Sequence, residues 1–175
     1  MSSTVTSGQR EFAVRFWGTR GSIPSPKTPQ VLRERLKETL EAFRHEAVSG
    51  SLSTDKALQS EKAVETFLEQ LPHWQSQGYG GDTFCVQMEG ADEPMIIDAG
   101  SGIRRLGEEL MRGPCGKGQG VVHLFFTHFH WDHIIGLPFF TPVFIRGNQI
   151  HIYAVQDDVE SCVRQVFRKP FFPVG

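Results

Sequence analysis

Three imidazoles and one carboxylate lie within six consecutive residues of this chain, a density that points to metal chemistry. The segment reads Thr127-His128-Phe129-His130-Trp131-Asp132-His133. Neutral imidazole binds zinc, iron and other borderline metals, and a carboxylate adds a hard oxygen ligand. Taken singly, Asp132 can be explained as a helix N-cap and one histidine as a core residue, but neither explanation accounts for the whole cluster. The cluster therefore predicts a metal site.

The spacing inside the cluster predicts two neighbouring metal positions. His128 and His130 are two residues apart, so an extended backbone directs both rings toward one metal. Asp132 and His133 lie where the chain turns into a helix, so they can face a second metal nearby. A pair of metals stabilises the attacking and the leaving oxygen of a displacement and produces a hydroxide nucleophile at neutral pH.

The elements around the cluster are expected to place it at one end of a sheet. The apolar run 121–126 predicts a buried strand, so the ligands lie on the loop that leaves its C-terminal end, where sites form in open α/β sheets. His123 lies inside this run and is predicted to be structural. Alternation and helical periodicity predict further strands at 11–17, 83–88, 95–97 and 149–155, and helices at 31–48, 103–111 and 159–169.

Four segments in order resemble the metallo-β-lactamase superfamily. His128-x-His130-x-Asp132-His133 is similar to its HxHxDH signature, and the preceding segments are Arg15-Phe16-Trp17-Gly18-Thr19-Arg20-Gly21-Ser22-Ile23-Pro24, Tyr79-Gly80-Gly81-Asp82-Thr83-Phe84-Cys85 and Ile97-Asp98-Ala99-Gly100-Ser101-Gly102-Ile103. Because Gly136-Leu137-Pro138 follows the signature, the resemblance favours the ribonuclease Z and phosphodiesterase branch. It implies an α/β (α+β) fold, the αββα sandwich, of which this chain covers about the first half.

The resemblance also implies roles for individual residues. His128 and His130 would bind one divalent ion and Asp132 and His133 a second. Zn²⁺ is expected, with Mn²⁺ and Fe²⁺ as alternatives, and Asp132 is counted as catalytic. Asp98 and Thr127 are expected to support the ligands without binding metal, although Asp98 is alternatively an N-cap for the helix at 103–111. Arg20 is a candidate for contacting an anionic substrate at the rim of the site.

Length and composition agree with one globular domain. The 175 residues, 39% of them hydrophobic, are expected to form a single domain over 1–175 with a helical hairpin inserted at 27–75. In the hairpin's first helix, one apolar stripe is expected from Leu32, Leu36, Leu40, Phe43 and Ala47. No residues matching the ligands of the family's second half follow Phe171, so weakened metal affinity and an uncovered apolar sheet face are expected.

Charge and cysteine usage narrow the partners and the compartment. A net charge of −2 does not favour nucleic acid, which stays open as a partner. Three cysteines without CxxC spacing predict reduced thiols. With no visible signal peptide and no apolar run of about 20 residues, we expect a cytoplasmic protein without a membrane partner.

The function expected from these observations is hydrolysis of a small phosphodiester or nucleotide by a metal-bound hydroxide. Two alternatives stay open: a metallohydrolase acting on a thioester or lactone, and a non-catalytic metal-binding or interaction fragment. Homo-oligomerisation through the uncovered sheet face is a further expectation.

Overall fold

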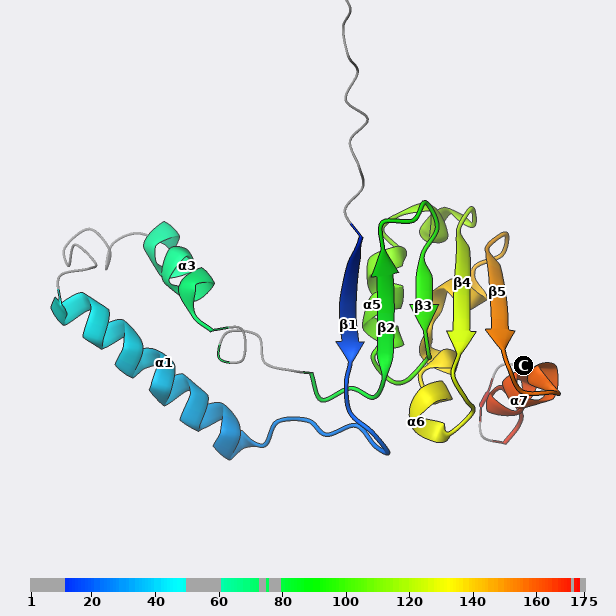
Figure 1. Cartoon of the computed structure of the whole chain (residues 1–175), viewed down its shortest axis with the longest axis horizontal. Helices are drawn as coiled ribbons and strands as arrows, with labels where there is room; N and C mark the ends of the chain where they lie inside the picture. The colour runs from blue at the N-terminus through cyan, green and yellow to red at the C-terminus, as the bar shows by residue number, and fades with distance from the viewer. Residues whose placement is uncertain (1–11, 50–60, 73–74, 76–79, 171, 174–175) are drawn as a thin grey trace, which may run out of the picture. The chain divides into compact units, whose positions relative to one another are not determined.

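The structure is a computed structural model that describes residues 12–49, 61–72, 75, 80–170 and 172–173. The chain divides into two compact units, Met1–Ser25 with Gly81–Gly175, and Pro26–Gly80. Each unit is described by itself (Figure 1). The insertion at 27–75 stays a prediction.

The first unit contains a five-stranded mixed sheet in which neighbouring strands are also neighbours in sequence. Strands β1 to β3 pair antiparallel, whereas β3, β4 and β5 run parallel (Figure 1). The bounds are β1 (Ala13–Gly18), β2 (Cys85–Glu89), β3 (Met95–Ile97), β4 (Val121–Phe126) and β5 (Gln149–Ala154).

The strand predictions are confirmed with small shifts at the ends. Strands β3 and β4 have the predicted bounds, and β5 ends one residue early. Strand β2 begins at Cys85 rather than at Thr83. Thr83 pairs with Ser101 instead, because its amide donates to the Ser101 hydroxyl at 3.0 Å and its own hydroxyl accepts from the Ser101 amide at 2.7 Å.

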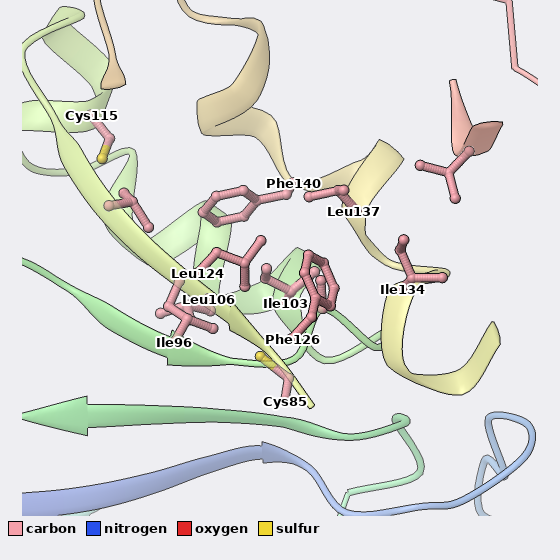
Figure 2. Packing of buried hydrophobic residues seen from close by; sticks show 13 residues of the cluster. Cys85, Ile96, Ile103, Leu106, Cys115, Leu124, Phe126, Ile134, Leu137 and Phe140 are labelled. Atoms are coloured by element: carbon pink, nitrogen blue, oxygen red, sulfur yellow. The ribbon is translucent and has the colours of Figure 1, made fainter. Parts of the chain in front are cut away.

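One face of the sheet is covered by short helices and forms the core. These are α5 (Ile103–Leu110), η1 (Pro114–Lys117), α6 (Trp131–Ile134), η2 (Leu137–Phe139), η3 (Thr141–Phe144) and α7 (Val159–Val166). Ile96 and Leu124 on neighbouring strands pack with Ile103, Leu106 and Phe140, and all five are fully buried (Figure 2). This core includes Phe126, so it holds the end of β4 from which the histidine segment begins.

The opposite face carries apolar side chains that are exposed at the β1 edge. Val14 and Phe16 pair with Met88 and Val86, and they are 46% and 63% exposed. The expectation of an uncovered apolar face is therefore met at this edge, while association through it stays a prediction. On the core side of the same strand, Arg15 binds Glu89 at 2.9 Å and Glu109 at 3.0 Å.

Two helices form the second unit, α1 (Pro29–Ser49) and α3 (Glu61–Gln70). Phe43 and Phe67 meet edge to face with ring centroids 5.1 Å apart, and Phe67 is buried. The apolar stripe predicted on α1 is not buried as a whole, because Leu36 and Leu40 are 64% and 66% exposed. A single partner helix covers only one side of α1. Residues 50–60 of the predicted hairpin lie outside the described residues.

All three cysteines are free, as predicted. Burial raises the pKa of the Cys85 thiol, with smaller contributions from the charges of Asp98 and Asp82, and burial also raises the pKa of Cys115. Both thiols are thus packing groups rather than nucleophiles.

None of the helices in the described part of the chain has the length and apolar character to cross a membrane.

Replacing Gly136 with Ala should destabilise the first unit. A Cβ at this position would lie 2.1 Å from the Gly100 carbonyl oxygen, a backbone atom with no room to move. We expect the free energy of unfolding to fall by about 1–3 kcal/mol, the usual cost of overpacking, as measured by urea denaturation. The control is Gly113→Ala, whose Cβ would meet only the Leu110 carbonyl at 3.6 Å. Equal stability of the two variants would contradict the packing described.

Candidate metal centre

The predicted ligands lie on the loop that follows β4 and in the single turn of α6 that comes next. The His128 ring lies 4.4 Å from that of His130 and 4.1 Å from that of His133, measured between ring centroids. His130 precedes α6, and Asp132 and His133 belong to its single turn. The turn from strand to helix brings His133 back against His128, so that three imidazoles lie close together.

Asp98 is the residue that holds this loop. It ends the β3 segment with a φ of 59° and is fully buried. Its Oδ1 accepts the Thr127 amide at 2.8 Å, and its Oδ2 accepts the Thr127 hydroxyl at 2.7 Å. The same Oδ2 lies 2.8 Å from His133 Nδ1. The alternative role of Asp98 as an N-cap is wrong, because Gly102 occupies the N-cap of α5 without a side-chain hydrogen bond.

These contacts fix the tautomers of two imidazoles. An ionised carboxylate only accepts hydrogen bonds, so His133 Nδ1 carries the proton that it donates to Asp98. Likewise the Thr127 hydroxyl donates to Asp98 and therefore accepts from His128 Nδ1, 3.0 Å away. Nε2 is then the metal-binding nitrogen of both rings, an assignment that follows from the hydrogen-bond network.

Asp132 presents its carboxylate beside one of these nitrogens. Its Oδ2 lies 3.3 Å from His133 Nε2 and accepts a hydrogen bond from the Ser22 backbone amide at 2.9 Å. The Ser22 amide lowers the pKa of Asp132 below its ordinary value, with help from the Asp132 backbone amide, whereas burial opposes the shift. The explanation of Asp132 as a helix N-cap is wrong, since His130 occupies that position.

The donor set fits a divalent metal in its chemistry. His133 Nε2 and Asp132 Oδ2 are both lone-pair donors when the proton sits on Nδ1, and a cation between such groups relieves their repulsion. Across the residues that the structure describes, however, no group of three or more His, Cys, Asp or Glu side chains is arranged to hold a metal ion. The two-metal set of four ligands therefore stays a prediction.

The loop after β1 contributes a backbone contact to this centre in addition to the residue predicted there, Arg20. Arg20, the predicted substrate contact, is exposed, and its backbone bridges Thr83. Two residues later the Ser22 amide reaches Asp132, a contact that the sequence analysis missed. The only available signal was the Gly21-Ser22 pair within the segment that resembles the family. A role of Arg20 in substrate binding stays a prediction.

We expect the pKa of Asp132 in the metal-free protein to lie below the ordinary aspartate value of about 3.9. Because the pKa of Asp132 is lower in the folded state, the contact stabilises the fold fully at pH values above the pKa in the unfolded state. This stabilisation is lost as the pH falls through the pKa in the folded state. A carboxyl ¹³C NMR titration measures this pKa. A value at or above the ordinary one would contradict the contact with Ser22.

Comparison with known proteins matches the part of the chain that carries this centre. Residues 78–151 match the family described as metallo-beta-lactamase superfamily. Ribonuclease Z of Haloferax volcanii is 46% identical over 55 residues, which make up 31% of this chain and 15% of that protein. No solved structure matches the chain. The matched segment carries the histidine loop and lies within a mixed α/β architecture with a five-stranded sheet, so this part of the chain is similar to the metallo-β-lactamase superfamily.

Proposed function

We propose that this chain carries part of the centre of a metal-dependent phosphodiesterase. The observation that carries the proposal is the buried Asp98 carboxylate, which orients His133 at 2.8 Å and holds Thr127 at the start of the histidine loop. Carboxylates in this position orient metal-bound histidines and increase their basicity. The matching family and the similarity to a protein named ribonuclease Z support hydrolysis of a phosphodiester.

His128 and His130 would hold one divalent ion, and Asp132 and His133 a second, with Zn²⁺ as the expected metal. When bound, such ions act as Lewis acids toward a phosphoryl oxygen and lower the pKa of a water molecule. Asp98 keeps the His133 proton on Nδ1, so that Nε2 faces the Asp132 carboxylate. The Thr127 hydroxyl accepts from His128 Nδ1 and so keeps the His128 proton on that nitrogen. The Ser22 amide lowers the pKa of Asp132 and so favours the ionised carboxylate, the form that binds a cation.

A small phosphodiester or nucleotide is the proposed substrate. The net charge of −2 provides no overall attraction for a long polyanion, which favours a small substrate over a large nucleic acid. The name of the similar protein nevertheless keeps RNA as a candidate. Arg20 lies on the loop whose Ser22 amide contacts Asp132, so its guanidinium is the proposed contact for a phosphate group.

A non-catalytic metal-binding role is the second candidate. One observation favours it over a complete two-metal catalytic centre: no three ligating side chains within the described residues are arranged around a common point. The two candidates differ in turnover, and a thioester or lactone hydrolase differs from both in its substrate.

Replacing His130 with Ala should remove metal and activity together. We expect the purified chain to bind zinc and to cleave bis(p-nitrophenyl) phosphate, and His130→Ala to lower zinc affinity by more than the roughly 10–100-fold that the loss of a group supporting a ligand costs, with a parallel loss of turnover. Elemental analysis and absorbance at 400 nm, roughly the p-nitrophenolate maximum, are the measurements. His45→Ala is the matched control, because His45 is an exposed residue of α1 in the other unit.

The possible outcomes separate the candidates. Zinc binding without cleavage of any ester supports the non-catalytic role, and cleavage of a thioester in preference to the phosphodiester supports the alternative hydrolase. If neither zinc nor turnover is detected and His130→Ala behaves as the parent chain does, the proposed function is wrong.

A further inference from the structure

We propose that the Gly21–Ser22 turn positions Asp132 for metal binding through the backbone amide of Ser22. This inference rests on the proposed function, because it concerns the same centre. Nothing in the HxHxDH spacing assigns a role to this turn, which lies 110 residues away from Asp132 in the sequence.

The Ser22 contact involves the carboxylate oxygen of Asp132 that faces His133. The Ser22 amide donates to Asp132 Oδ2 at 2.9 Å, and it is this oxygen that lies 3.3 Å from His133 Nε2. A carboxylate oxygen has two lone pairs, so it can accept the amide and still face the imidazole. On its other side His133 is held by Asp98, 2.8 Å from Nδ1. Ser22 thus holds the Asp132 carboxylate on one side of the His133 ring, while Asp98 holds the ring from the other side.

The turn is itself anchored to the sheet. The amides of Thr19 and Arg20 both donate to the Asp82 carbonyl, at 3.1 and 3.0 Å, and Ser25 donates to Gly81 at 2.6 Å. Ser22 therefore lies between two attachments to the chain that leads into β2. An amide held in this way does not need to be ordered when the metal binds, which is what a positioning group must provide.

The conformation of Ser22 supports an aimed amide rather than a chance contact. Its φ of 64° is left-handed, a region that non-glycine residues adopt only when the surrounding structure imposes it. The neighbouring Gly21 lies beside the same carboxylate, since a Cβ there would meet Asp132 Oδ2 at 4.0 Å, an ordinary van der Waals contact. The contact uses only the backbone, so the serine hydroxyl is not required.

The test compares variants that keep the Ser22 amide with one that removes it. Ser22→Gly keeps the N–H and accepts a positive φ, whereas Ser22→Pro has no N–H and cannot adopt this φ. Zinc affinity is measured by competition with a chromophoric chelator, using Zn²⁺ alone as the probe. We expect Ser22→Pro to bind zinc about 10-fold more weakly, as is usual when a group that supports a ligand is lost, and Ser22→Gly to bind like the parent chain.

Because proline can disturb the loop more widely, the same change is repeated in an Asp132→Ala background. If Ser22 acts through Asp132, the proline adds no further loss of affinity there. Circular dichroism and urea unfolding check that each variant is folded, and Ile23→Ala, at a neighbouring residue that is 71% exposed, is the control for the loop.

Three results overturn the inference, each in a recognisable way. Unchanged zinc affinity in Ser22→Pro overturns the inference but leaves the proposed function standing. An equal loss of zinc affinity in the Asp132→Ala background has the same consequence, because it would reveal a general structural role of the turn. Failure of Ser22→Pro to fold in either background moves the decision to a backbone amide-to-ester replacement at Ser22, which removes the N–H without restricting φ, and unchanged zinc affinity there overturns the inference. Absence of zinc binding by the parent chain overturns the proposed function itself.

Discussion

The burial of one negative charge constrains the rest of the structure. Asp98 is fully buried, and a carboxylate in that position is tolerated only when its oxygens are fully hydrogen-bonded. Thr127 and His133 supply those bonds, so the end of β3, the start of the histidine loop and α6 must meet at one point. The backbone follows the same requirement: the Ala99 amide donates to the His133 carbonyl at 2.7 Å, and the Gly136 amide to the Ala99 carbonyl at 2.8 Å.

The fold around the sheet could be predicted from local sequence patterns. Alternation and apolar runs depend on nearest neighbours along the chain, and they gave β3 and β4 their correct bounds. His123 was predicted to be structural from its place inside β4. It binds Glu93 and lies 3.0 Å from the Tyr153 hydroxyl, on the face of the sheet opposite the core. The late start of β2 was missed because Thr83 is engaged by Ser101, on another segment.

The centre was predictable in its ligands but not in its supports. Histidines at close spacing are visible in the sequence, whereas the amide of Ser22 has no side-chain signature and meets Asp132 only in the folded chain. The same limit applies to α1. Its leucines have helical spacing, but which side of a helix is covered depends on the partner, and α3 contacts the side that carries Phe43. Contacts between distant segments therefore account for most of what sequence patterns missed.

The ion pairs of Arg15 have a consequence for strand alignment. Strand β1 is an edge strand that alternates Val14 and Phe16 outward with Arg15 toward the core side, where it meets Glu89 and Glu109 and lies over the Trp17 ring. A slip of one residue would exchange the two faces. Phenylalanine would then replace the guanidinium opposite two carboxylates, leaving both acids without their cation. The ion pairs of Arg15 therefore favour the observed register of β1. A sheet with the shifted register would lose these ion pairs although its amino-acid composition is the same.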